Sequence, residues 1–163
     1  MSNELSNKYF FRRNESQQWQ DVTTLFDGIK ILSITGLDDI GDSVNVYVQQ
    51  WINSQKEDYM CANQDQQGND VVIRKNVDLS LTFVAATRYS QNKNVDTQTV
   101  YNAFVDYVAK KGAFYLKSEY THKQAYVVCQ KAFKPTNIKL NRGLNSFILA
   151  TIPLHTLDEP TSY

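Results

Sequence analysis

A strict alternation of apolar and polar residues marks the segment from Asn76 to Ala86. Its apolar members are Val77, Leu79, Leu81, Phe83 and Ala85, and Asp78, Ser80 and Thr82 stand between them. A period of two places alternate side chains on opposite faces of a β-strand. The segment therefore predicts a strand with one face in the core and the other face in water or against a partner.

A helix is predicted over about Gln98 to Lys111, where the apolar residues change to helical spacing. Val100, Phe104, Tyr107 and Val108 form one stripe of that helix. Asp96 or Thr97 can cap its free backbone amides, and Gly112 favours its end because glycine accepts the left-handed conformation that closes many helices. Ala113 to Lys117 follows almost without a linker, so we expect a strand against which the helix packs directly.

Further strands are predicted from β-branched runs and from alternation bounded by glycine and proline. The Gly28–Thr35 run and the alternating Val44–Val48 segment are expected to pair as a hairpin, and another strand is expected to begin at Val71. The final third predicts strands over His122–Phe133, Asn137–Leu140 and Leu144–Leu154. In the first of these, Tyr126 and Val128 face away from Val127, Cys129 and Phe133. Both faces of this strand are thus partly apolar, as in a layer that is covered twice.

The pattern predicts an α+β fold, mainly an antiparallel β-sandwich or partial barrel with one flanking helix. The 163 residues suit one domain over residues 21–157. Residues 1–20 are polar with interspersed aromatic residues and are expected to form a flexible or partner-docking arm. Residues 53–69 are rich in Asn, Gln, Asp and Lys and predict a long loop, and residues 158–163 predict an irregular tail.

Charge and cysteine content narrow the setting of the protein. Seventeen basic and seventeen acidic side chains give zero net charge, so the whole molecule exerts no general attraction on nucleic acid or anionic membranes. Its apolar runs are far shorter than the roughly 20 residues of a membrane helix, and we expect neither membrane insertion nor secretion. Cys61 and Cys129 lie far apart, which favours two free thiols in a reducing cytoplasm over a disulfide.

Candidate catalytic and metal chemistry is sparse. His122 and His155 do not lie at ligand spacing from each other or from a cysteine. Asp38, Asp39 and Asp42 lack the alternating ligand pattern of a calcium loop, and Asp158 and Glu159 are adjacent in the predicted tail. A phosphate-binding glycine loop and a Gly-x-Ser-x-Gly elbow are both missing from the sequence. We therefore expect no catalytic, cofactor-binding or metal-binding residues.

Aromatic residues provide a second kind of candidate site, because aromatic side chains dominate the buried anchors of protein interfaces. The chain has ten tyrosines and eight phenylalanines. The candidate interface residues are Tyr9, Phe10, Trp19, Trp51, Tyr59 and Tyr126. An alternative hypothesis comes from Lys123, Lys131 and Lys134, which are interleaved with tyrosines in the manner of a platform that stacks single-stranded nucleic acid.

Four segments together resemble small tail proteins of tailed bacteriophages and prophages. They are NVDLSLTFVA from Asn76, VYNAFVDYV from Val100, GAFYL from Gly112 and SFILATIPL from Ser146. The resemblance lies in the order of elements and their hydrophobic texture, and it covers about half of the chain, from Asn76 to Leu154. It implies a fold like that of tail-tube and tail-terminator proteins, which close into rings and carry no catalytic residues.

The resemblance also implies a function and partners. The chain would be a non-enzymatic structural component of a phage or prophage tail, forming a homo-oligomeric ring such as a hexamer and contacting neighbouring tail proteins. It would reside in the virion tail after assembly and in the cytoplasm of the bacterial host before it, with no membrane partner. Nucleic acid would be met only as DNA passing through the channel. A single-stranded nucleic-acid-binding β-barrel remains the alternative, and a small enzyme is a third hypothesis.

Overall fold

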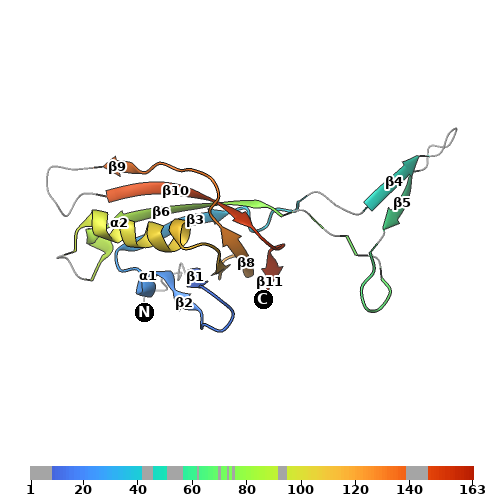
Figure 1. The fold of residues 1–163 in the computed structure, drawn as a ribbon, viewed down its shortest axis with the longest axis horizontal. Helices are drawn as coiled ribbons and strands as arrows, with labels where there is room; N and C mark the ends of the chain where they lie inside the picture. The colour runs from blue at the N-terminus through green and yellow to red at the C-terminus, as the bar shows by residue number, and fades with distance from the viewer. Residues whose placement is uncertain are drawn as a thin grey trace. The chain divides into compact units, whose positions relative to one another are not determined.

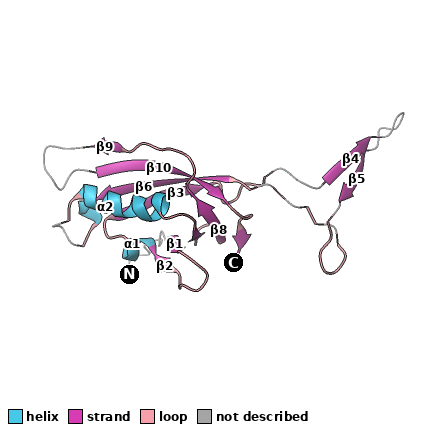
Figure 2. Cartoon of the chain, viewed as in Figure 1, coloured by secondary structure: helices cyan, strands magenta, loops and turns pink. Residues whose placement is uncertain are grey.

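The computed structural model describes residues 9–41, 46–50, 57–61, 63–69, 71–72, 74, 76–91, 95–138 and 147–163. The chain divides into two compact units. The main unit contains Met1–Asp39 and Val77–Tyr163, and the second unit is Ile40–Asn76, inserted between them in the sequence. Strands dominate both units, as the magenta arrows of Figure 2 show.

An antiparallel sheet forms the main unit, and nine strands belong to it in the described part of the chain. The strands run in the order β2-β1-β7-β8-β10-β6-β3, with β9 beside β10 and β11 beside β8. Figure 1 shows β9 alongside β10. Their bounds are β1 Tyr9–Arg12, β2 Gln20–Asp21, β3 Ile29–Thr35, β6 Asp78–Ala86, β7 Phe114–Ser118, β8 Lys123–Val128, β9 Thr136–Ile138, β10 Phe147–Thr156 and β11 Thr161–Ser162. The short helices are α1 Val22–Leu25 and η1 Thr87–Tyr89.

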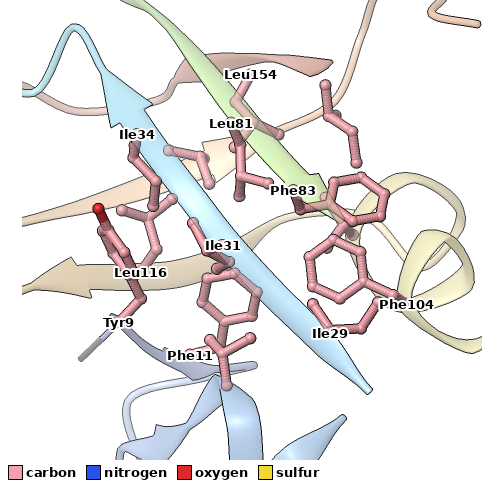
Figure 3. Close-up of a cluster of buried hydrophobic side chains, with 14 of the residues drawn as sticks. Tyr9, Phe11, Ile29, Ile31, Ile34, Leu81, Phe83, Phe104, Leu116 and Leu154 are labelled. Carbon is pink, nitrogen blue, oxygen red and sulfur yellow. The ribbon is translucent and has the colours of Figure 1, made fainter. Parts of the chain in front are cut away.

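Strand β10 joins the two halves of this sheet. It pairs with β6 along nine residues, from Phe147 opposite Ala86 to His155 opposite Asp78. Only its last residues, His155 and Thr156, pair with β8. Buried side chains from β3 and β6 and buried side chains from β1 and β7 belong to one core (Figure 3). The sheet therefore folds round on itself as a partial barrel, and the predicted α+β class with a mainly antiparallel sheet is confirmed.

Helix α2 (Thr97–Val105) continues into a π-helical turn, η2 (Asp106–Lys110). The Asp96 carboxylate accepts a hydrogen bond of 2.7 Å from the Thr99 amide, as expected of an N-cap, and Gly112 closes the helix with a φ of +85°. Val100, Phe104 and Val108 are buried, so the predicted stripe faces the core.

The helix enters an aromatic core through Phe104, which is fully buried. Its ring lies 4.5 Å from Phe83 of β6, 5.1 Å from Phe26 and 6.2 Å from Phe11 of β1, measured between centroids. Aromatic side chains from both halves of the sheet thus pack on the same helical residue, as Figure 3 shows for Phe104, Phe83 and Phe11. Such packing adds to the burial of apolar area, at about 0.5–1.5 kcal/mol for each well-oriented ring pair.

The N-terminal segment differs from its prediction. Of the expected arm over residues 1–20, Tyr9–Arg12 forms strand β1, which pairs with β7 and holds Phe11 fully buried. Gln20 begins β2 and pairs with Phe11 of β1. The polar composition hid this strand, because only two of its four side chains enter the core.

The strand pairing around the insertion also differs. The predicted hairpin of Gly28–Thr35 with Val44–Val48 is wrong, because β3 pairs with β6. Strand β4 (Val46–Gln50) pairs instead with β5 (Glu57–Cys61), which lies inside the predicted loop over 53–69. The strand expected from Val71 begins only at Asp78. Alternation shows which face of a strand is buried but does not identify its neighbour, so β3 could only be assigned to β6 through their shared core.

Candidate interaction surface

The outward side chains of β1, β7 and β8 form two rows that cross the strands. The first row consists of the register partners Arg12, Tyr115 and Tyr126. The second row consists of the register partners Phe10, Lys117 and Gln124. Trp19 and Tyr163 lie over the rows from the flanking segments. We call these eight residues the aromatic–cation face. Cross-strand neighbours on one face of a sheet contact each other directly, which explains why the sequence groups these residues only after the strands have paired.

The first row is a continuous stack. The guanidinium carbon of Arg12 lies 4.3 Å from the Trp19 ring centroid and 5.1 Å from that of Tyr115. The rings of Tyr115 and Tyr126 then stack at 4.4 Å with an interplanar angle of 27°. The Tyr115 hydroxyl donates a hydrogen bond of 3.2 Å to Glu15. Desolvation and then this contact with a carboxylate raise the pKa of Tyr115.

The second row centres on Lys117. Its ammonium nitrogen lies 5.0 Å from the Phe10 ring centroid, 5.1 Å from Trp19 and 4.8 Å from Tyr163. The C-terminal segment is attached here, because the Tyr163 hydroxyl donates to the Ser118 carbonyl at 2.9 Å and the Tyr163 amide donates to the His122 carbonyl at 3.1 Å. A cation held over aromatic rings contributes roughly 0.5–1 kcal/mol per contact at an exposed site. The side chains of the face are therefore preorganised.

A cleft of about 220 Å³ runs along the first row, from Arg12 to Tyr126. Its lining combines the two stacked tyrosines with Arg12, Gln124 and Thr161, and with the carboxylates of Glu15, Asp158 and Glu159. Asp158 and Glu159 are exposed and belong to the turn between β10 and β11. The predicted C-terminal tail thus contributes to this cleft, since Thr161 pairs with Gln124 of β8.

A second cleft, of about 210 Å³, lies where β6 and β10 run side by side. Asp78 there accepts from His155 Nδ1 at 2.9 Å, and Lys131 Nζ lies 3.8 Å from the same carboxylate. The hydrogen bond from His155 and then the charge of Lys131 lower the pKa of Asp78. Among the described residues no group of three His, Cys, Asp or Glu side chains is placed to hold a metal ion.

The six predicted interface residues have different positions. Phe10, Trp19 and Tyr126 all lie on the aromatic–cation face. Tyr9 points to the other side of β1, where it is only 7% exposed and its ring lies 5.9 Å from that of Tyr120. Tyr9 therefore packs within the subunit. Trp51 lies outside the described residues, and Tyr59 belongs to β5 but its side chain is not described.

The structure does not gather Lys123, Lys131 and Lys134 into one face. Lys123 begins β8 and lies 3.7 Å from Asp38, whereas Lys131 follows the other end of that strand and lies beside Asp78. Six residues of strand separate the two ends by about 17 Å at roughly 3.3 Å per residue. Lys134 is exposed in the segment before β9. Two of the three cations thus lie within 4 Å of a carboxylate.

Arg12, Gln124 and Tyr163 are members of the face that the sequence pattern does not single out. Alternation in the Tyr9–Arg12 segment was the available signal for Arg12, since it separates buried Tyr9 and Phe11 from outward Phe10 and Arg12. Tyr163 had no comparable signal, because β11 has only two residues and its pairing with β8 depends on the fold. Cys129 is half-buried with a free thiol, and desolvation raises its pKa.

These features define an α+β protein with an antiparallel partial barrel and a preorganised aromatic surface. In the part of the chain that the structure describes, no helix is long and apolar enough to cross a membrane. No family model matches the chain, and no curated protein matches it.

One similar solved structure is the crystal structure of the Dit protein (gp 19.1) of phage SPP1. That protein is described as a paradigm of the hub adsorption apparatus in phages that infect Gram-positive bacteria. The TM-score is 0.46 at 8% sequence identity, and the match covers 96% of this chain and 52% of the SPP1 chain. The chain thus spans about half the length of that protein.

Proposed function

We propose that this chain is a non-enzymatic structural component of a phage or prophage tail that assembles as a homo-oligomeric ring. The observation that carries the proposal is the aromatic–cation face. It presents five aromatic side chains and two cations in fixed geometry on one side of the sheet, all of them partly or largely accessible to solvent. Aromatic residues and arginine are the types enriched at the energetic centres of protein interfaces.

The order of elements supports the tail hypothesis. The four segments on which the sequence resemblance rests occupy β6, α2, the start of β7 and β10, in that order. The resemblance therefore involves elements that pack on one core, since Phe83 of β6, Phe104 of α2, Phe114 of β7 and Ile152 of β10 are all fully buried.

The edge of the sheet also suits an assembly. Strand β3 is seven residues long and pairs only with β6 within the described part of the chain. Leu32, at the irregularity in the pairing of β3 with β6, is 49% exposed on this edge strand. A long edge strand with an exposed apolar residue favours contact with another chain, and repeated contacts of one kind close into a ring when the rotation between subunits allows it.

Electron microscopy and sedimentation of the purified full chain test the proposal. We expect rings or tubes at high protein concentration. The variant Phe10→Ala with Trp19→Ala should stay folded and lose the assemblies, because its side chains belong to the aromatic–cation face and not to the core. Gln98→Ala with Asn102→Ala is the matched control, since both side chains are exposed on α2, outside the aromatic–cation face and the β3 edge. A monomer at every concentration, with no binding to other tail proteins, would overturn the proposal.

The alternative, a module that binds single-stranded nucleic acid, is distinguished by the lysines. Replacing Lys123, Lys131 and Lys134 by Gln should leave ring assembly unchanged if the tail proposal is right. Under the alternative, the same variant should lose affinity for a single-stranded oligonucleotide and show a flatter dependence of that affinity on salt. Salt-sensitive binding that is abolished by these three substitutions would favour the nucleic-acid function.

A further inference from the structure

The stack in the first row of the aromatic–cation face ends at Tyr126. Trp19 and Tyr115 share the Arg12 guanidinium, and Phe10 and Tyr163 share the Lys117 ammonium. Within the described part of the chain, Tyr126 is the one ring of this face that no cation covers. One face of the Tyr126 ring is occupied by Tyr115, and the ring lines the cleft of about 220 Å³.

The charges around this ring are unbalanced. Glu15, Asp158 and Glu159 line the cleft, and Arg12 is the only cation that does so among the described residues. Arg12 is already held between two rings, and Glu15 accepts the Tyr115 hydroxyl. Asp158 and Glu159 lie in the turn after β10, outside the salt bridges found among the described residues. The cleft therefore attracts a positive group and repels a phosphate.

We propose that this cleft binds an arginine side chain presented by a partner protein, with the guanidinium stacked on Tyr126 and paired with Asp158 or Glu159. The proposal rests on the function proposed above, since it assigns a partner contact to the same face. The bound guanidinium would stack on Tyr126 as the Arg12 guanidinium stacks on Trp19 and Tyr115. The cleft has the volume of roughly seven water molecules, which suits one long side chain.

Arginine fits this site better than lysine. Its guanidinium is planar and weakly hydrated, so it stacks on an aromatic face while its edge donates paired hydrogen bonds to a carboxylate. The ammonium of lysine is a strongly hydrated point charge and loses more solvation on a ring. The geometry at Arg12, 4.3 Å above the Trp19 ring, shows the stacked arrangement within this same face.

Nuclear magnetic resonance with a labelled full-length chain tests the inference. The probe is a short, capped glycine-rich peptide with one central arginine, and the matched peptide carries citrulline, which has nearly the same shape without the charge. We expect the arginine peptide to shift the signals of Gln124, Tyr126 and residues 158–161. The citrulline peptide should bind roughly tenfold more weakly, because it lacks both the cation–π and the ionic interaction. A lysine peptide should bind with intermediate affinity.

Two variants and one control identify the site. Tyr126→Ala should remove the shifts, and so should Asp158→Asn with Glu159→Gln, whose exposed positions leave folding intact. Tyr89→Ala should bind the peptide like the unaltered chain. Equal binding of the arginine and citrulline peptides, or arginine-dependent shifts that persist in both cleft variants, would overturn the inference. So would the absence of any shift.

The outcome is separable from the test of ring assembly. Rings without peptide binding would leave the proposed tail function standing and refute the arginine site. Peptide binding by a chain that never assembles would support the site and refute the ring.

Discussion

Arg13 fastens the segment after β1 to the end of the helix. Its guanidinium donates to the Tyr107 carbonyl at 2.7 Å, to that of Gly112 at 3.1 Å and to that of Ala113 at 3.2 Å, and it lies 4.1 Å from the Tyr107 ring centroid. The last carbonyls of a helix have no partners within the helix. One side chain therefore satisfies carbonyls that the π-helical turn leaves open.

Arg13→Ala should lower the free energy of unfolding by about 2–3 kcal/mol, because several charge-assisted hydrogen bonds disappear together. Urea unfolding followed by circular dichroism measures the loss. The free energy of unfolding of Arg13→Lys should lie between that of Arg13→Ala and that of the unaltered chain, since an ammonium cannot span the same carbonyls. Lys134→Ala, at an exposed position, should change stability by less than about 0.5 kcal/mol. An Arg13→Ala variant as stable as Lys134→Ala would show that the clamp contributes nothing.

At the scale of single residues, the sequence predicts what depends on local spacing. Asp96 was one of two expected helix caps, and Gly112 was the expected helix end. Arg13 had no such signal, because its acceptors lie about 100 residues further along the chain. The same limit applies to the aromatic–cation face, where Phe10, Trp19 and Tyr126 were candidates but their common location depends on how β1, β7 and β8 pair.

Among the elements, helix α2 depends on its N-cap in a way that pH can reveal. The hydrogen bond from the Thr99 amide lowers the pKa of Asp96 below its usual value. A carboxylate with a depressed folded pKa stabilises the fold above its unfolded pKa, and this contribution is lost as pH falls through the folded pKa. We expect Asp96→Ala to lower the melting temperature at neutral pH and to approach the unaltered chain in acid. Asp96→Asn retains a capping oxygen without a titrating group. Its melting temperature at neutral pH should therefore fall less than that of Asp96→Ala. A pH-independent difference for Asp96→Ala would contradict the charged cap.

Strand β1 should behave as part of the core and not as an arm. Phe11→Ala should cost about 3–5 kcal/mol, because a fully buried ring contacts Phe104 and Phe114 and its loss leaves a cavity. Phe10→Ala is the matched control in the same strand, since its side chain points to the outer face and should cost much less. Urea unfolding compares the two variants. Equal losses would mean that β1 does not pair with β7 in the register that buries Phe11 and exposes Phe10.

Hydrophobic periodicity predicts a helix or strand well where one face of the element is apolar and the other polar, as in β6 and α2. It was unreliable for pairing, because β3 has the burial pattern of a strand without a pattern that selects β6 over β4. Composition misled in the N-terminal segment, where two buried side chains suffice to anchor β1. Hydrophobic periodicity therefore established the fold class, and the partners of the strands required the shared core.

The second unit, Ile40–Asn76, is an insertion into the connection between the neighbouring strands β3 and β6. Thr35 of β3 is the register partner of Ser80 of β6, so the main sheet needs only a short turn between them. Gly36 follows β3 with a φ of +100°, and a β-carbon there would lie 2.6 Å from the Asp78 carbonyl oxygen. Leu37 and Val77 on the two sides of the insertion are buried in the main core. The residues that flank Ile40–Asn76 on both sides thus belong to the core of the main unit.

Replacing Ile40–Asn76 by a short glycine- and asparagine-rich turn should leave the main unit folded. Its unfolding should stay cooperative and its stability should change by about 1 kcal/mol or less, since loop length affects closure entropy only weakly. We expect the same variant to lose ring assembly. A two-stranded sheet such as β4 with β5 is marginally stable by itself in water. Under the proposed ring assembly, a neighbouring subunit would supply a further layer. Urea unfolding and electron microscopy of the variant measure the two effects separately. Rings that persist without the insertion would assign the subunit contacts to the main unit alone, and an unfolded variant would show that the insertion is needed for the core.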